Sequence, residues 1–267
     1  ASVAALRGSR ADAIVCVPAF YMYAVCADAA GGRVVEVPVN SDYSFPLDAM
    51  LRAITPDTRL IFLTNPNNPT GQIIPKEQIL AVVRAAPQAL ILLDEAYADF
   101  ANETLIGDPE ARALPNLVIG RTFAKAYGLA GLRAGALVGD PKTLAPLRQV
   151  IPTFSLNICA AGALTAAFED IGYYSWYLDQ VGASKALLYA ALDRLGVRYW
   201  KSAANFVLVS FGDDAPRVLE ALAAKRIYVR DRSRDYASPG CVRVTTGVVE
   251  HTQTFINALE EVLCGAA

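Results

Sequence analysis

The chain of 267 residues contains a single histidine, His251. One imidazole excludes metal sites built from several histidines, and it leaves a Ser-His-Asp triad with only one unlikely candidate. We therefore predict no metal site. We expect His251 to be a surface residue at the start of the last helix.

Cysteines are few, and their spacing does not suggest disulfide or metal-binding pairs. The five cysteines are Cys16, Cys26, Cys159, Cys241 and Cys264, an odd number with no C-x-x-C pair among them. Cys16 lies in an apolar, strand-like run, where a reduced thiol in the core is the usual explanation. The pattern favours a reducing compartment and predicts a cytoplasmic protein.

Charge of one sign and long apolar runs are also missing. The net charge is −2 and there is no basic run, which argues against nucleic acid or an anionic membrane as a partner. No apolar stretch reaches the ~18 to 20 residues that a membrane span requires. The 54% of hydrophobic and 19% of charged residues are typical of a globular protein with one long domain or two unequal ones.

The first half of the chain alternates short apolar, β-branched runs with helical patterns. The predicted strands are residues 13–17, 33–37, 59–64, 89–93, 116–121 and 135–138. Residues 76–85 place Ile79, Leu80 and Val83 on one helical face. This alternation predicts an α/β fold, with a mostly parallel sheet covered by helices on both faces.

The pattern changes from about residue 151. We expect helices at residues 160–170, 174–195, 218–225 and 252–263, and strands at 205–210, 227–230 and 241–245. The second of these helices is long enough to bridge two domains. We therefore predict a large domain at residues 1–165 and a smaller α/β domain at residues 166–267.

Three polar motifs follow predicted strands of the first half, where parallel sheets bind their ligands. The first is Asn-Pro-Asn-Asn-Pro-Thr-Gly at residues 65–71, which on composition alone would be a turn. The functional alternative gives Asn68 a side-chain N–H to donate to a phenolic oxygen of a cofactor. The second motif is Asp94-Glu95-Ala96-Tyr97.

Asp94 comes directly after a buried strand. It could cap a helix, since Asp caps readily. Alternatively, its carboxylate could stay ionised by pairing with a pyridinium N–H, because a buried carboxylate without a partner is costly. Tyr97 could point its hydroxyl at the same ring, or it could be a half-buried aromatic side chain with a wet end.

The third motif holds Lys125, which lies between Thr122 and a Gly/Ala-rich run that leads to Arg133. Most lysines are solvated, but desolvation and nearby cations would lower the pKa of this one and supply a neutral amine for carbonyl capture. Arg133 could offer its fork to a phosphate, or it could be a surface arginine.

Arg243 is a charged residue in the otherwise apolar predicted strand at residues 241–245. A substrate carboxylate held by two parallel hydrogen bonds would be a good partner for it. The alternative is a structural ion pair with Asp231 or Glu250.

These motifs resemble the fold-type I pyridoxal phosphate (PLP) enzymes, within them the class I/II aminotransferases, and most closely the histidinol-phosphate aminotransferases. The resemblance implies that Lys125 binds the cofactor covalently and later moves a proton, and that Asp94 keeps the ring nitrogen charged. It implies further that Phe20 stacks on the ring. The remaining implied contacts are Asn68 and Tyr97 with the ring oxygen, Thr122 and Arg133 with the cofactor phosphate, Arg243 with the substrate α-carboxylate, and Arg230 and Arg232, as weaker candidates, with a substrate phosphate.

The chain departs from the family pattern at two places. Ala124 stands where the family usually has a serine, which removes one phosphate hydrogen bond worth roughly 1 to 2 kcal/mol. The family's amino-terminal part, with a phosphate-binding loop, a tyrosine for the partner subunit and an early strand, is not found before the strand predicted at residues 13–17. We therefore expect weak PLP binding, an exposed apolar edge at residues 135–138 and a homodimer only in the full-length form.

The leading hypothesis is transamination between an amino donor, either histidinol phosphate or an aromatic amino acid, and 2-oxoglutarate. A PLP-dependent decarboxylase of a phosphorylated amino acid would share every motif named above. A third possibility is a truncated member of the family without catalysis.

Overall fold

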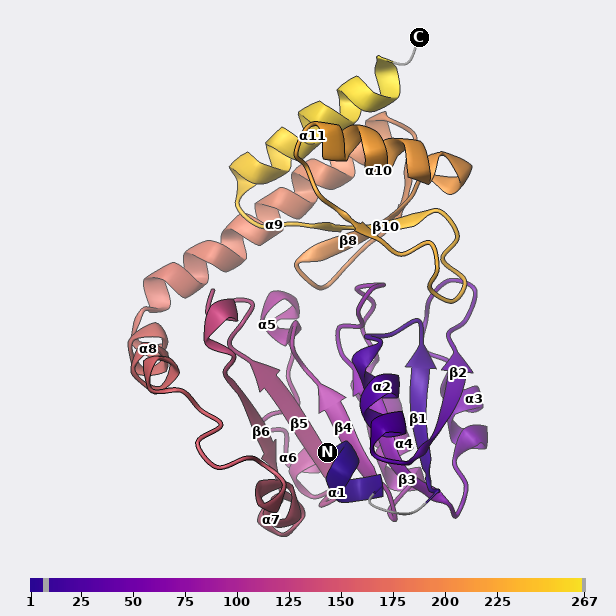
Figure 1. Cartoon of the computed structure of the whole chain (residues 1–267), viewed down its shortest axis with the longest axis vertical. Coiled ribbons are helices and arrows are strands. Elements are labelled where there is room, and N and C mark those ends of the chain that lie inside the picture. The colour runs from indigo at the N-terminus through magenta and orange to yellow at the C-terminus, as the bar shows by residue number, and fades with distance from the viewer. Residues whose placement is uncertain (7–9, 266–267) are drawn as a thin grey trace.

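The computed structural model describes residues 1–6 and 10–265, which form two sheets, each with its own helices (Figure 1). The first part of the chain comprises α1 (Ser2–Leu6), β1 (Asp12–Val17), α2 (Met22–Ala29), β2 (Arg33–Pro38), α3 (Leu47–Ala53), β3 (Thr58–Thr64), α4 (Lys76–Ala85), β4 (Leu90–Asp94), α5 (Ala98–Ala101), α6 (Pro109–Arg112), β5 (Leu117–Thr122), η1 (Ala130–Leu132) and β6 (Gly135–Gly139). The second comprises α7 (Pro141–Gln149), α8 (Ile158–Glu169), α9 (Ile171–Arg194), β7 (Arg198–Trp200), β8 (Phe206–Ser210), η2 (Gly212–Asp214), α10 (Ala215–Ala224), β9 (Arg230–Asp231), β10 (Cys241–Thr245) and α11 (Val249–Cys264).

The first sheet has six strands in the order β2-β1-β3-β4-β5-β6. The pairs from β2 to β5 are parallel, and β6 runs antiparallel to β5. The predicted α/β class with a mostly parallel sheet is confirmed. The six strands expected in this half lie within one residue of the observed ones at each end, and α4 has the predicted bounds.

Side chains alternate between the two faces of this sheet. Ile14 and Ile61 belong to the core cluster that α3 and α4 cover, whereas Ala13, Leu60 and Phe62 pack with α1 and α2 on the other face. Successive strand residues point to opposite faces, so a strand that is buried on both sides is continuously apolar. The parallel strands β3, β4 and β5 place their carboxyl ends at one edge of this doubly covered sheet.

Strand β6 lies at the end of the first sheet, and its residues from Gly135 to Val138 are exposed. Leu137 and Val138 keep 40% and 39% of their surface in contact with solvent. The strand therefore presents the exposed apolar edge that was expected at residues 135–138.

The second sheet has four antiparallel strands in the order β7-β8-β10-β9. It packs against α9, α10 and α11 around a separate apolar core. The strand expected at residues 227–230 is wrong in its extent, because β9 holds only Arg230 and Asp231. The residues just after α10 instead bond back to the helix end, where the Ile227 N–H donates to the Leu222 carbonyl at 2.9 Å.

Helix α9 runs from the first sheet to the second, as Figure 1 shows. The Asp170 side chain caps its start by accepting from the Tyr173 N–H at 2.9 Å. Tyr174 then bonds Asp99 of the first half, while Leu188 belongs to the core of the second. The helix expected at residues 174–195 is confirmed, and it makes contacts in both halves of the chain. The expected domain boundary between residues 165 and 166 falls inside α8, and its position stays a prediction.

Two other expectations concern His251 and Cys16. His251 is exposed in the first turn of α11, as expected. Cys16 is a free thiol packed against the first core, and burial raises its pKa to about 12. Within residues 1–6 and 10–265, no helix combines the length and apolar character that crossing a membrane would need.

Candidate active site

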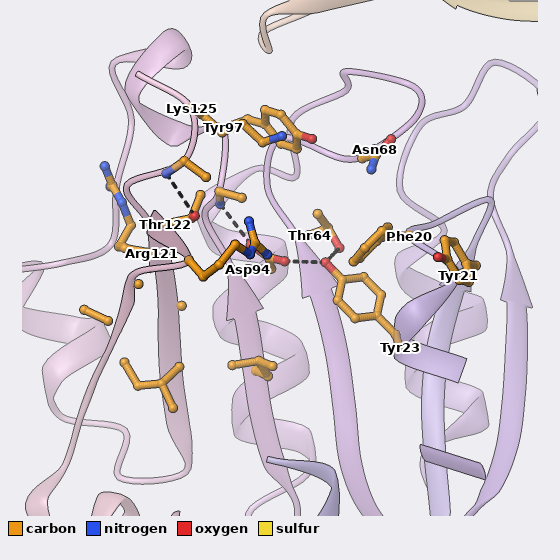
Figure 2. Close-up of a pocket in the computed structure, with 18 of the residues that line it drawn as sticks. Phe20, Tyr21, Tyr23, Thr64, Asn68, Asp94, Tyr97, Arg121, Thr122 and Lys125 are labelled. Carbon is orange, nitrogen blue, oxygen red and sulfur yellow. Dashed lines mark hydrogen bonds between the residues drawn. The ribbon is translucent and has the colours of Figure 1, made fainter. Parts of the chain in front are cut away.

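A cavity of about 820 Å³ lies beyond the carboxyl ends of the parallel strands, with part of its wall from the second sheet. Every residue predicted for the site lines it: Phe20, Asn68, Asp94, Tyr97, Thr122, Lys125, Arg133, Arg230, Arg232 and Arg243. The parallel topology explains why the three motifs meet. Strands β3, β4 and β5 are neighbours in the sheet, and one motif follows the carboxyl end of each. Figure 2 shows the part of this site that the first sheet carries.

Asp94 is the last residue of β4, and both of its carboxylate oxygens are bonded. Oδ1 accepts from the Ala96 N–H at 2.9 Å, and Oδ2 accepts from the Tyr23 hydroxyl at 2.5 Å (Figure 2). Burial raises the pKa of Asp94, and the two hydrogen bonds and the charge of Lys125 oppose that shift. The alternative of a helix cap is wrong, because α5 begins only at Ala98.

Tyr97 lies between the lysine and the second sheet. The Lys125 ammonium is 5.3 Å from the centre of its ring, and the ring of Phe206 meets it edge-on at 5.0 Å. Tyr97 is only 7% exposed, and burial raises the pKa of its hydroxyl. The hydroxyl is therefore protonated at neutral pH and can donate to a ligand in the cavity.

Lys125 occupies a tight turn after β5. The Gly128 N–H donates to the Lys125 carbonyl at 3.0 Å, and Gly128 has a φ of 69°, which favours glycine. Burial lowers the pKa of the half-buried ammonium, and Arg243 and Arg133 lower it further, while Asp94 opposes them. The shift favours the neutral amine, as the sequence predicted.

Thr122 and Arg133 flank the lysine on the β6 side of the cavity. The Thr122 hydroxyl accepts from the Ala124 N–H at 3.2 Å. Arg133 is exposed, and its Nη1 donates to the Ala130 carbonyl at 2.9 Å. Since one guanidinium nitrogen is engaged there, the remaining donors are open to an anion.

Arg243 reaches the cavity from β10. Its Nη1 donates to Asn68 Oδ1 at 2.5 Å, and its guanidinium lies 4.9 Å from the centre of the Phe206 ring. In the part of the chain that the structure describes, the buried Nε of Arg243 has no hydrogen-bond partner, and no ion pair joins Arg243 to Asp231 or Glu250. The alternative of a structural ion pair is therefore wrong. Because Oδ1 of Asn68 is occupied, its amide N–H groups are left for another acceptor.

The other two arginines predicted for the substrate, Arg230 in β9 and Arg232 directly after it, differ from each other. Arg232 pairs with Asp235 at 2.5 Å, and its buried Nε has no hydrogen-bond partner among the described residues. Arg230 is exposed and lies opposite Arg243 in the β9–β10 ladder. Together these side chains make the second-sheet wall of the cavity cationic.

Sequence reasoning gave no role to several residues that the structure brings into or beside the cavity: Tyr23, Thr64, Arg121 and Phe206. Tyr23 stands three residues after Phe20, the helical spacing that puts two side chains on one face, and that spacing was an available signal. Arg121 ion-pairs with Glu95 at 3.3 Å and also with Asp99, so it holds the turn that carries Asp94 and Tyr97.

The chain belongs to the class I and II aminotransferases, whose family model matches residues 2–259. It is 42% identical over 254 residues to histidinol-phosphate aminotransferase 2 of Ralstonia nicotianae, covering 93% of this chain and 67% of that protein. It is 39% identical to histidinol-phosphate aminotransferase 1 of Cupriavidus pinatubonensis, covering 91% and 66%. The chain thus spans about two thirds of the length of these curated relatives.

Solved structures agree with this membership. The chain superposes with a TM-score of 0.87 and 28% identity on histidinol-phosphate aminotransferase from Sinorhizobium meliloti, solved in complex with pyridoxal-5'-phosphate, covering 96% of this chain and 71% of that one. A TM-score of 0.90 relates it to the enzyme of that name from Clostridium acetobutylicum, where 22% identity shows the fold alone.

PLP is the cofactor of this family, and the residues present fit it. The cavity holds a carboxylate that is bonded on both oxygens, a lysine whose pKa is lowered, and an amide whose oxygen accepts from Arg243, which leaves its N–H groups as donors. These are matched to a ring nitrogen, an aldehyde and a phenolic oxygen respectively.

Proposed function

We propose that this chain carries out PLP-dependent transamination, with histidinol phosphate as the amino donor and 2-oxoglutarate as the acceptor. One observation carries the proposal: Lys125, Asp94 and Arg243 line one cavity although they come from three different elements. The names of the Ralstonia and Cupriavidus relatives support the choice of donor. An aromatic amino acid is the other donor that we consider.

When bound, PLP supplies an electron sink for the electrons of the bond broken at the donor's α-carbon. Lys125 would hold the cofactor, and its neutral amine would take the proton from the donor's α-carbon and deliver it to the cofactor. Asp94 would hold the ring nitrogen in its charged form, and Phe20 would stack on the ring. Asn68 and Tyr97 would donate to the ring oxygen.

The cofactor and the substrates carry phosphate or carboxylate groups, and the arginines of the cavity can bind these anions. Thr122 and Arg133 bind the cofactor phosphate in this proposal. Arg243 binds the α-carboxylate of the 2-oxo acid or of an aromatic donor, because its planar fork matches two carboxylate oxygens. Histidinol phosphate has no carboxylate, so its phosphate requires other cations. Arg230 and Arg232, which lie beside Arg243, are the candidates.

The experiment is a comparison of donors. The chain is loaded with PLP and given 2-oxoglutarate with histidinol phosphate, phenylalanine or tyrosine, and glutamate formation is measured. We expect the highest kcat/KM with histidinol phosphate. An aromatic amino acid that is equal or better would overturn the choice of donor, and an absence of glutamate with every donor would overturn transamination.

The same experiment separates the alternatives. Release of carbon dioxide from O-phosphothreonine without glutamate formation would favour the decarboxylase. The chain superposes with a TM-score of 0.82 on L-threonine-O-3-phosphate decarboxylase from Porphyromonas gingivalis, but at 24% identity this likeness concerns the fold alone. A folded chain that leaves the absorbance of added PLP unchanged would favour a member without catalysis.

We propose further that the full-length protein works in the cytoplasm as a homodimer. The free state of all five cysteines is compatible with a reducing compartment. Sedimentation of the full-length protein tests the dimer, and a monomer at all accessible concentrations would contradict it.

A further inference from the structure

Tyr23 is a buried tyrosine whose hydroxyl points at the acid of the candidate active site (Figure 2). It belongs to the first turn of α2 and donates to Asp94 Oδ2 at 2.5 Å. The Thr64 hydroxyl, at the end of β3, donates to the Tyr23 oxygen at 3.1 Å. Thr64, Tyr23 and Asp94 therefore form one directed chain of hydrogen bonds.

The direction of the chain matters for the charge of Asp94. A tyrosine hydroxyl has one hydrogen, and because Thr64 donates to its oxygen, that hydrogen is free to point at the carboxylate. Hydrogen bonds donated to a carboxylate favour its ionised form, and they oppose the cost of its burial. Tyr23 and the Ala96 N–H bond different oxygens, so they also fix the rotation of the carboxylate.

The ring of Tyr23 makes a second set of contacts. It is stacked on Phe62, with centroids 4.9 Å apart and an interplanar angle of 17°, so the sheet fixes its plane. Phe20 meets it edge-on, with centroids 5.7 Å apart and an angle of 87°. Phe20 is 39% exposed, and Tyr23 is a buried support beneath it.

We propose that Tyr23 is a positioning residue of this site: its hydroxyl keeps the Asp94 carboxylate ionised and aimed at the cofactor nitrogen, and its ring supports Phe20 against the cofactor plane. The part that concerns the cofactor rests on the proposed function. The part that concerns the carboxylate does not. The titratable groups that face Asp94 are Tyr23 from α2, Tyr97 from the following turn and Lys125 from the turn after β5.

The first experiment uses the chain without added cofactor. The pKa of the Asp94 carboxyl group is measured by carbon-13 NMR titration in the wild type and in Tyr23→Phe, with Asp94→Asn to assign the signal. We expect Tyr23→Phe to raise the pKa of Asp94, because the variant keeps the ring and loses the donor. Thr64→Val should raise it less. An unchanged value in Tyr23→Phe would overturn the proposal for the carboxylate.

Tyr199→Phe is the matched control, because the Tyr199 hydroxyl donates to Asp193 at 3.0 Å on the exposed surface. It removes the same kind of bond away from the cavity. We expect the Asp94 titration to be unchanged in this variant. An equal shift in both variants would mean that the effect is not local, and the proposal would fall.

The second experiment measures PLP affinity by fluorescence titration. A hydrogen bond to a charged group suggests about a tenfold weaker Kd in Tyr23→Phe. Tyr23→Leu, which also removes the ring beneath Phe20, should bind more weakly still. Equal affinity in all three proteins would overturn the role toward the cofactor. If the wild type itself binds no PLP, the proposed function fails, while the carboxyl titration still decides the role of Tyr23 toward Asp94.

Discussion

The two ends of the cavity differ in how firmly the protein holds its polar side chains. At one end Asp94 has both oxygens bonded and is supported from α2 and β3. At the other end Thr122 and Arg133 stand beside the exposed strand β6, and Arg133 is itself exposed. The end that would hold the cofactor ring is enclosed, whereas the end that would hold its phosphate is open.

The difference follows from the position of the strands. Strand β4 lies inside the sheet with neighbours on both sides, whereas β6 is an edge strand whose one partner among the described residues is β5. The last residue of a central strand is surrounded by neighbouring strands and helices, and their side chains and backbone groups can bond it. An edge strand leaves a row of backbone N–H and C=O groups unpaired and open to solvent or to another chain. We expect changes at the enclosed end to have larger effects than changes at the open end.

The largest effect is expected when the enclosed end is disrupted. Asp94→Asn keeps the shape of the side chain but removes the charge that would stabilise the ring nitrogen. Loss of one preorganised electrostatic group suggests a fall in kcat of about 10²- to 10³-fold. Steady-state kinetics with saturating PLP provide the measurement. Asp193→Asn, at an exposed aspartate that also accepts from a tyrosine, is the control, and similar rates in the two variants would contradict the account.

The next effect concerns the wall from the second sheet. Arg243→Lys should leave the absorbance of bound PLP intact and raise KM for 2-oxoglutarate about tenfold, because an ammonium cannot reproduce the planar fork. Arg217→Lys, at an exposed arginine of α10, should change nothing. An unchanged KM in Arg243→Lys would remove Arg243 from the substrate site.

At the open end the loss should be smaller than at Asp94. Arg133→Ala removes one charge-assisted contact to the cofactor phosphate, which suggests about a tenfold weaker Kd for PLP with little change in kcat at saturation. Titration of PLP followed by kinetics separates the two quantities. A fall in kcat as large as that of Asp94→Asn would break the distinction between the two ends.

The smallest effect is expected at the exposed edge itself. Val138→Lys places a charge on β6 and should reduce association between chains without changing thermal stability by more than a few degrees. Sedimentation velocity at several concentrations measures the association. The same change at Val25, an exposed residue of α2, is the control. Equal association of the two variants would show that chains do not associate through β6.

Much of the enclosed end could be predicted from the sequence. Strands such as β4 are short apolar runs bounded by polar motifs, and in a parallel sheet each motif is delivered to the same edge. Asn68, Asp94 and Lys125 could therefore be grouped before any coordinate was known, and all three line one cavity. Helices α5 and α6 are among those that were not predicted, and here four residues are too few to show a helical period.

Contacts between distant parts of the chain could not be predicted. The hydrogen bond of Arg243 joins it to Asn68, 175 positions earlier, and that of Tyr23 joins it to Asp94, 71 positions later. In neither pair does the sequence around one residue indicate which residue is its partner. For Arg243 the nearby acids Asp231 and Glu250 were the only partners that sequence proximity suggested, and the fold selected an amide instead.

We propose that Lys125 is the lysine that binds PLP covalently. The direct measurement is borohydride reduction of the PLP-loaded chain, followed by peptide mapping. We expect a reduced label on Lys125 and no label in Lys125→Ala, although burial also lowers the pKa of Lys185. A label on Lys76, Lys142, Lys185, Lys201 or Lys225 in the wild type would contradict it.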